Sequence, residues 1–213
     1  MHDSCLVIMA KQPLPGMAKT RIGATLGNDY AATLAEQLLH YTLVKAQRLN
    51  DELDFHVQPI LCVSPQINRY FKSLATHFST GLIAQTEGDL GARMQAATNY
   101  ALSQASHVII IGTDCPALNA HHIHQARKAL DHVDVYLQPA QDGGYVLIAF
   151  KENLSCLFKN KPWSTPELLE TTLAELTHVG MSYELGDYLN DIDEADDLVH
   201  LPLSFARPSE ELQ

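Results

Sequence analysis

The chain has 213 residues, enough for one α/β domain or two small ones with a sizeable core. Apolar residues make up 46% of it, an ordinary share for a globular protein, and the formal net charge of −11 argues against a broad surface for nucleic acid. No stretch approaches the ~18 apolar residues of a membrane helix, the N-terminus lacks a signal-peptide pattern, and the four cysteines show no C-x-x-C spacing. We therefore expect a cytoplasmic protein with reduced thiols and with neither a nucleic-acid nor a membrane partner.

Short apolar runs alternate with amphipathic segments through the first 130 residues. Strands are predicted at residues 6–10, 55–63, 82–85 and 107–112, and helices at 29–49, 65–75, 89–103 and 120–130. Pro59 indicates a bend or an edge position for the second strand, and Asp89 has the place of a helix N-cap. This alternation predicts a mostly parallel sheet with helices on both faces.

The last third of the chain follows a different pattern. Strands are predicted at 134–140 and 145–150 around the turn QDGG (141–144), which implies a hairpin-like pair and a mixed sheet. A helix is predicted at 165–176, with Ser164 and Glu167 at capping-box spacing, and a last short helix at 193–200. We expect one domain over residues 1–213, with residues 204–213 as a loose tail.

The segment KQPLPGMAKTR (11–21) follows the first predicted strand. From Gly16 onward it looks like part of a phosphate-binding loop, but it has neither the Gly-Lys pair of a P-loop nor the G-x-G-x-x-G of a dinucleotide-binding turn. It does place Lys11, Lys19 and Arg21 at the C-terminal end of a strand, where open parallel sheets bind ligands. Phosphate is the natural counter-ion of such cations, and a solvated loop with surface charges is the alternative.

Carboxylates follow the apolar run HVIIIG (107–112), and a second group lies near the C-terminus. Asp114 is a candidate ligand of Mg²⁺ or Mn²⁺, because hard divalent cations bind carboxylate and phosphate oxygens together; a turn or cap role is the alternative. Asp191 and Asp193 would share one face of an extended segment, and Asp196 and Asp197 follow at a helix turn; these four acids could supply a second carboxylate. The alternative for this second group is a solvated acidic turn.

Three further segments carry weaker signals. Arg93 lies one turn into a predicted helix whose N-terminus attracts anions, and an unpaired surface arginine is the alternative. The sequence DGG at 142–144 is by itself typical of a plain β-turn. The histidines at 121, 122 and 124 lack the spacing of a metal-binding helix, so we expect no metal there.

Six segments, taken in order, resemble the motifs of the bacterial radical-SAM/selenodomain-associated transferases. They are KQPLPGMAKTR, GDLGARM, IGTDCPAL, PAQDGGYVLI, PWSTPELL and DIDEADDL. The resemblance extends over residues 6–198 and implies the GT-A nucleotide-diphospho-sugar transferase fold, a three-layer α/β/α arrangement around a mixed, mostly parallel sheet.

A weaker likeness points to two groups of nucleotidyltransferases. The first loop and the Asp-Gly-Gly turn resemble phospholactate guanylyltransferases, and the segments TDCPAL and DIDEADDL resemble molybdenum-cofactor guanylyltransferases. The chain departs from the latter group because it lacks an L-A-G-G-x-G opening and has Glu194-Ala195 where Thr-Pro is usual.

The resemblance implies roles for individual residues. Mg²⁺ or Mn²⁺ would be bound by Asp114 and Asp193, with Asp191 an open alternative for the second ligand. The nucleotide or its phosphates would be contacted by five residues: Lys11, Gly16, Lys19, Arg21 and Arg93. The acceptor side would be formed by four others: Asp142, Gly143, Gly144 and Trp163. Asp142 would act as the catalytic base, and Arg93 would stabilise charge on the leaving group; a core position is the alternative for Trp163.

The expected activity is therefore transfer of a sugar from a nucleotide sugar to an unidentified small-molecule acceptor. One alternative is a guanylyltransferase-like transfer of a nucleoside monophosphate from an NTP to a phosphorylated acceptor. These two differ in their product, which is a nucleoside diphosphate in the first case and pyrophosphate in the second. A non-catalytic nucleotide-binding protein on the same fold is the third alternative.

Overall fold

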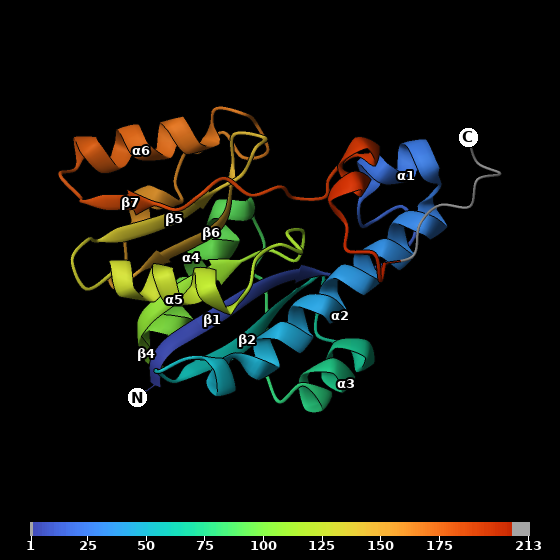
Figure 1. The fold of residues 1–213 in the computed structure, drawn as a ribbon, viewed down its shortest axis with the longest axis horizontal. Helices are drawn as coiled ribbons and strands as arrows, with labels where there is room; N and C mark the ends of the chain where they lie inside the picture. The colour runs from blue at the N-terminus through green and yellow to red at the C-terminus, as the bar shows by residue number, and fades with distance from the viewer. Residues whose placement is uncertain (1, 206–213) are drawn as a thin grey trace.

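The computed structural model describes residues 2–205, and within that range seven strands form one sheet in the order β3-β2-β1-β4-β6-β5-β7 (Figure 1). The strands are β1 (His2–Lys11), β2 (Val57–Ser64), β3 (Gly81–Ala84), β4 (Ala105–Ile111), β5 (Val135–Pro139), β6 (Tyr145–Phe150) and β7 (Tyr183–Leu185). β6 is antiparallel to its neighbours β4 and β5, whereas the other paired strands are parallel. The tail predicted at 204–213 lies almost wholly outside the described residues.

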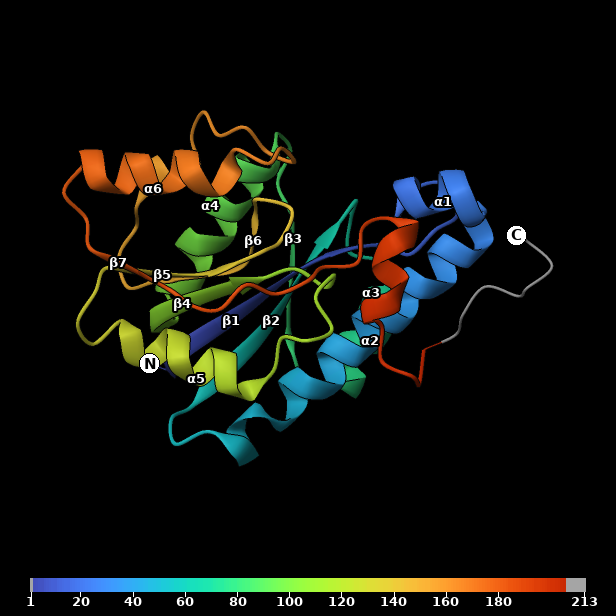
Figure 2. The same ribbon diagram turned by 45° about the horizontal axis from the view of Figure 1, so that its top comes forward.

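Helices cover both faces of this sheet (Figure 2). They are α1 (Thr20–Leu26), α2 (Asn28–Glu52), α3 (Arg69–His77), α4 (Leu90–Leu102), α5 (Ala120–Ala129) and α6 (Leu168–His178), with the 3₁₀ helices η1 (Ser155–Leu157) and η2 (Ala195–His200). One apolar cluster joins the sheet to α2, α3 and α5, and a second joins it to α4 and α6. The predicted fold class, a three-layer α/β/α arrangement with a mixed, mostly parallel sheet, is confirmed.

The central strand β1 shows why its apolar run is continuous. Leu6 and Ile8 belong to the cluster with Leu43 of α2, whereas Cys5 and Val7 belong to the cluster on the opposite face. Successive side chains of a strand point to opposite faces, so a strand covered on both sides must be apolar at every position. The same reason explains the run HVIIIG that becomes β4.

Two predicted helix starts can be compared with the structure. Asp89 is the N-cap of α4, since its side chain accepts a hydrogen bond from Ala92 N at 2.8 Å, as predicted. The capping box predicted for Ser164 and Glu167 is wrong. α6 begins at Leu168 and Glu167 makes no side-chain cap, because Ser164 has a left-handed backbone (φ 63°) in the preceding loop.

The edge position predicted from Pro59 is also wrong, because β2 lies between β3 and β1. Pairing of β2 with β3 begins only at Ile60, so Pro59 falls just outside that ladder of hydrogen bonds. A proline is tolerated there because no residue of the shorter strand β3 pairs with position 59. The lack of a backbone N–H therefore removes no hydrogen bond between β2 and β3.

Three elements have no counterpart in the prediction, namely α1, the 3₁₀ helix η1 and the exposed three-residue strand β7. The predicted last short helix is present as the 3₁₀ helix η2. α1, η2 and the first half of α2 share a third apolar cluster, which includes Ile22, Leu34, Ile192 and Leu198. We call this unit the α1–η2 lobe; it lies beyond the C-terminal end of β1 (Figure 1).

Candidate functional site

The candidate site lies at the C-terminal ends of β1 and β4. The chain order reverses here, because β1 has β2 on one side and β4 on the other. Such a switch point leaves a crevice at the carboxyl edge of an open α/β sheet, and ligands bind there. Two pockets open at this edge, and three residues line both of them: Met9, Lys11 and Asp114.

The first cavity, which we call the polar pocket, has a volume of about 310 Å³ and lies between the sheet edge and the α1–η2 lobe. Its polar lining is Lys11, Lys19, Thr20, Arg21, Thr113, Asp114, Ser164 and Asp193. The first loop, the end of β4 and the segment before η2 therefore meet in one place, as the sequence motifs predicted.

At the floor of this pocket the Lys19 ammonium lies between two carboxylates. Its Nζ is 2.5 Å from Asp114 Oδ1 and 3.1 Å from Asp193 Oδ1, and it donates to the Ile192 carbonyl at 2.5 Å. We call Lys19, Asp114 and Asp193 the Lys19 cluster. Only 6% of the Lys19 side chain is exposed, whereas both carboxylates are close to half exposed toward the pocket.

The two carboxylates of this cluster stabilise the protonated form of Lys19. Burial by itself would lower the pKa of Lys19, but the charges of Asp114 and Asp193 offset it and leave that pKa raised. Lys19 also has a left-handed backbone (φ 49°, ψ 47°) at the N-cap of α1. A non-glycine residue in that region costs roughly 1–3 kcal/mol, and such strain is concentrated at functional sites.

A main-chain contact brings the distant segment 191–193 to the end of β4. Ile192 is fully buried in the α1–η2 lobe, and its N–H donates to the Asp114 carbonyl at 2.9 Å. This bond holds Asp193 opposite Asp114. Asp191 lies nearby in a half-buried position, where burial and the charge of Asp142 raise its pKa to about 6, with smaller contributions from Asp193 and Asp114.

Other predicted nucleotide ligands have different surroundings. Arg21 is over half exposed, with Nη1 3.6 Å from Asp193 Oδ2 and 3.5 Å from Glu194 Oε1. Lys11 is exposed at the junction of the two pockets. Gly16 (φ 73°) lies in the same loop but lines neither pocket, so the structure does not bring it together with the other residues.

The second cavity, the apolar pocket, has a volume of about 340 Å³. Its lining includes Leu90 and Arg93 of α4, Tyr145 of β6 and Trp163. Arg93 Nε donates to the Gly88 carbonyl at 3.0 Å and so closes the start of its own helix. The indole Nε1 of Trp163 is buried and has no hydrogen-bond partner among the described residues.

A glycine allows Trp163 to lie against α4. A Cβ at Gly91 would come within 3.0 Å of Trp163 Nε1 and 2.0 Å of the Phe158 carbonyl oxygen, so no side chain fits there. The segment GDLGARM therefore has a packing role for its second glycine, next to a cap role for Asp89.

The predicted acceptor residues at 142–144 form the turn between β5 and β6. Asp142 Oδ1 accepts a hydrogen bond from Gly144 N at 2.8 Å, which stabilises the turn. A Cβ on Gly143 (φ 89°) would come within 2.2 Å of the Pro166 carbonyl oxygen, so Gly143 permits close contact with the start of α6. None of the three lines either pocket, and their acceptor role stays a prediction.

Several pocket residues were missed by the sequence analysis. Thr20, Thr113 and Ser164 add hydroxyl groups to the polar pocket, and Gln85 lines the apolar pocket. Gln85 Nε2 donates to the Cys62 carbonyl at 3.0 Å, which ties the end of β3 to β2. The available signal was position, because Thr113 directly follows one predicted strand and Gln85 is the last residue of another, where open sheets bind ligands.

The Lys19 cluster contains the kinds of ligand atom that a divalent cation binds. Two carboxylates and one carbonyl converge on the point that the ammonium takes, and this all-oxygen set suits Mg²⁺ or Mn²⁺. Within residues 2–205 no group of three or more His, Cys, Asp or Glu has a metal-binding arrangement. Two protein carboxylates are nevertheless a common complement for Mg²⁺, which usually takes its remaining ligands from water and phosphate.

Residues 51–165, more than half of the chain, match the model of the family described as "Uncharacterized protein conserved in bacteria (DUF2064)". The chain belongs to this family. The matched range contains Asp114 and most residues that line the apolar pocket, whereas Lys19 and Asp193 lie outside it. No curated protein matches the chain.

Solved structures extend the comparison to the whole DUF2064 chain. A protein from Desulfovibrio desulfuricans G20, described as a "putative nucleotide-diphospho-sugar transferase", is 27% identical with a TM-score of 0.83, over 98% of this chain and 92% of the other. The inositol-1-phosphate CTP transferase from T. maritima is 11% identical with a TM-score of 0.61, over 93% and 92%. Rv0371c from Mycobacterium tuberculosis H37Rv, in complex with manganese, is 14% identical with a TM-score of 0.55, over 96% and 100%.

The last two likenesses establish the fold alone. One further observation concerns membranes: none of the helices in the described part of the chain is long and apolar enough to cross a bilayer.

Proposed function

We propose that this DUF2064 protein is a divalent-metal-dependent transferase that uses a nucleotide-activated donor, and that the donor is a nucleotide sugar. The convergence of Asp114 and Asp193 on Lys19, beside a cation-lined pocket at the switch point of the sheet, carries this proposal. The likeness to the 27% identical protein supports the choice of donor. Membership of the radical-SAM/selenodomain-associated transferases and a cytoplasmic location belong to the same proposal; the four unpaired cysteines agree with a reducing compartment.

In this proposal Asp114 and Asp193 would hold Mg²⁺ or Mn²⁺. The ion would supply neutralisation of the negative charge on the donor's phosphates. The manganese complex of a protein with the same fold supports the choice of ion. The exposed side chains of Lys11 and Arg21 would donate hydrogen bonds to the same phosphates from the rim of the polar pocket.

The two pockets suggest that the phosphates and the apolar part of a substrate bind in different places. The polar pocket would take the phosphates, because its lining carries hydroxyl groups and cations. The apolar pocket would take a flat or apolar part of a substrate against the Trp163 ring, with Arg93 at its edge to stabilise the leaving group. We assign proton removal from the acceptor hydroxyl to Asp142, with Gly143 and Gly144 shaping the turn that presents it.

Nucleotidyl transfer is the second candidate. It is supported by the shared fold with the CTP transferase, since the same carboxylates and cations can serve an attack on an α-phosphate. Glycosyl transfer releases a nucleoside diphosphate and nucleotidyl transfer releases pyrophosphate, so product identity separates them.

The test is a panel of nucleotide sugars and NTPs with Mn²⁺ and candidate acceptors, assayed for both products and for thermal shift. Release of a nucleoside diphosphate that is lost in Asp114→Asn supports the proposal, and release of pyrophosphate replaces it by the second candidate. A ligand at a hundredfold excess over its dissociation constant stabilises a protein by ~2.7 kcal/mol, so binding is visible without turnover. Stabilisation with no product would favour a non-catalytic nucleotide-binding protein, and no stabilisation by any member would contradict both enzymatic functions.

A further inference from the structure

The Lys19 ammonium already has all the partners that it can bind. A lysine has three N–H donors, and those of Lys19 are directed at Asp114 Oδ1, Asp193 Oδ1 and the Ile192 carbonyl. In this arrangement it has no donor left for a phosphate, although the sequence motif places it in a phosphate-binding loop. Lys11 and Arg21 differ, because both are exposed to the pocket.

The same oxygens are those that a divalent ion would use. An ion bound to both Asp114 Oδ1 and Asp193 Oδ1, at roughly 2.1 Å from each, would take the place between them that the Lys19 ammonium holds. An ammonium and a divalent ion held by the same two oxygens would also repel each other strongly. The ammonium and the metal therefore cannot occupy the carboxylate pair together.

The pocket offers the ammonium a second position. Lys19 lines the polar pocket, whose volume of about 310 Å³ adjoins the carboxylates. A lysine stem has four flexible carbons and its head can move several ångströms by rotamer changes. An ammonium that leaves the two carboxylates loses its anionic partners, and a phosphate in the polar pocket would supply a new one.

We propose that Lys19 is the resident cation of the Asp114–Asp193 pair, that a divalent ion enters only by displacing it, and that the displaced ammonium then binds the donor's phosphates. This inference rests on the metal site of the proposed function. Metal and nucleotide donor then bind cooperatively. The metal releases the Lys19 ammonium for the donor's phosphates, and the phosphates give the displaced ammonium an anionic partner. Metal alone binds weakly.

The first experiment measures binding of Mn²⁺ alone by calorimetry or by the loss of the free-ion paramagnetic resonance signal. Lys19→Met should bind Mn²⁺ at least tenfold more tightly than wild type, because the competing cation is gone. Lys11→Met is the matched control: it removes a lysine from the same pocket that has no carboxylate contact among the described residues, so its affinity should stay within about threefold. Asp114→Asn in the Lys19→Met background should abolish the tight binding.

The outcomes separate this inference from the proposed function. If wild type binds Mn²⁺ through Asp114 and Lys19→Met binds it no more tightly, the exchange is wrong and the metal site stands. If neither wild type nor Lys19→Met binds Mn²⁺, both the exchange and the metal site are wrong. Tighter binding that Asp114→Asn does not remove also overturns the exchange.

A second measurement uses the wild-type chain and does not depend on the folding of a variant. Acetylation by acetic anhydride, followed by mass spectrometry, reports the exposure of each lysine. Lys19 should react slowly in metal-free protein, because only 6% of its side chain is exposed, and at least about fivefold faster at saturating Mn²⁺. Lys11 should react equally in both states. An unchanged rate for Lys19 at saturating Mn²⁺ would overturn the exchange.

Discussion

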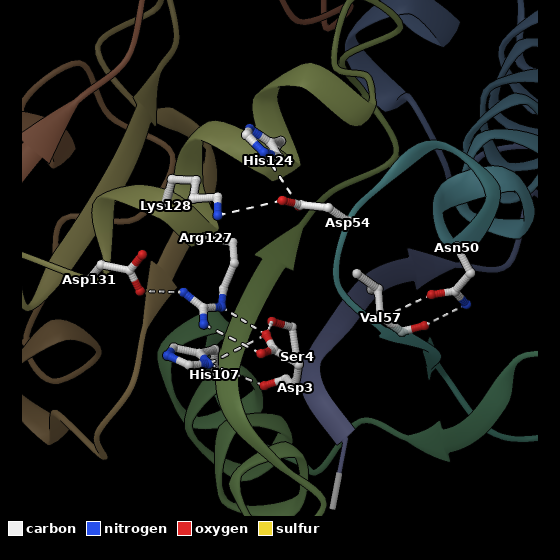
Figure 3. Close-up of polar contacts among 10 residues, drawn as sticks. All are labelled: Asp3, Ser4, Asn50, Asp54, Val57, His107, His124, Arg127, Lys128 and Asp131. Carbon is white, nitrogen blue, oxygen red and sulfur yellow. Dashed lines mark hydrogen bonds and ion pairs between the residues drawn. The ribbon is translucent and has the colours of Figure 1, made fainter.

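Two clusters of paired charges lie at opposite ends of the sheet. At the amino end of β1, Arg127 of α5 donates from Nε to Asp3 Oδ1 at 2.7 Å and from Nη1 to Asp131 Oδ1 at 2.7 Å (Figure 3). We call Asp3, Arg127 and Asp131 the Arg127 cluster. The Lys19 cluster lies at the carboxyl end, and both cations are mostly buried, with 16% of the Arg127 side chain and 6% of the Lys19 side chain exposed.

The two clusters differ in geometry and in what lies beside them. Arg127 pairs with both oxygens of Asp3 through its planar guanidinium, since Nη2 also donates to Oδ2 at 3.3 Å. Neither Arg127 nor Asp3 lines the polar or the apolar pocket. The Lys19 cluster instead holds a compact point charge on a strained backbone beside a cavity. A buried ion pair is therefore not evidence of a site; its place at the carboxyl edge, next to a pocket, is.

The largest expected difference between the clusters concerns turnover. Asp114→Asn should lower kcat/KM for the donor identified in the panel by about a thousandfold, because metal-assisted charge stabilisation contributes several kcal/mol and ~1.4 kcal/mol is a factor of ten. Steady-state kinetics at fixed Mn²⁺ would measure this. Asp3→Asn is the matched control in the Arg127 cluster and should change kcat/KM by less than about twofold. A variant Asp114→Asn that keeps a tenth of the activity would contradict the assignment.

The next largest effect is on the free energy of unfolding, to which we expect the Arg127 cluster to contribute more than the Lys19 cluster. Arg127→Met should lower the free energy of unfolding by about 2 kcal/mol, less than for a fully buried pair because Asp3 is one-third exposed. Urea denaturation at pH 7 would measure it.

A second measurement on the same variant is the affinity of the folded Arg127→Met protein for the donor. It should match wild type, since Asp3 lies at the amino end of β1 whereas both pockets lie at the carboxyl ends of β1 and β4. A loss of donor affinity without a loss of stability would place this cluster in the binding machinery and remove the distinction between the two ends.

A smaller effect is expected in the apolar pocket. Trp163→Phe keeps an aromatic ring against α4 but removes the buried N–H, and it should weaken binding of the donor or acceptor by about three- to tenfold, or roughly 1 kcal/mol. Trp163 is the chain's single tryptophan, so quenching of its fluorescence reports ligand binding in wild type. Leu90→Ala is a second probe of the same pocket. If the donor leaves the fluorescence unchanged, the apolar pocket is not its binding place.

The smallest effect is the pH dependence of the Arg127 cluster. The hydrogen bond from Arg127 lowers the pKa of Asp3 below its usual 3.8, although partial burial acts in the opposite direction. A carboxyl whose folded pKa is lowered contributes stability above its unfolded pKa and loses it as the pH falls through the folded value. The urea midpoints of wild type and Arg127→Met should therefore converge below pH 3.8. A difference that stays constant from pH 7 to pH 2.5 would show that the cluster acts through packing instead.

Local signals in the sequence were enough for most of the fold. The apolar run that becomes β4, the Asp89 cap and the turn at 142–144 each depend on residues within a few positions, so their patterns can be recognised without tertiary contacts. Alternation of such elements determines a three-layer sheet fold because parallel strands need crossover helices. The same logic located Asp114, since residues that follow a parallel strand gather at one edge of the sheet.

Other features were decided only by the tertiary structure. No sequence pattern predicted α1, and its place beside η2 depends on burying Ile22, Leu198 and their neighbours against α2, a contact between segments far apart in the chain. Nothing in the loop 11–21 indicates that Lys19 would face Asp193 instead of solvent, because that choice depends on the bond from Ile192 to Asp114. Sequence determined which charged residues reach the edge of the sheet; only closure of long-range contacts decided which of them pair and which remain open to a ligand.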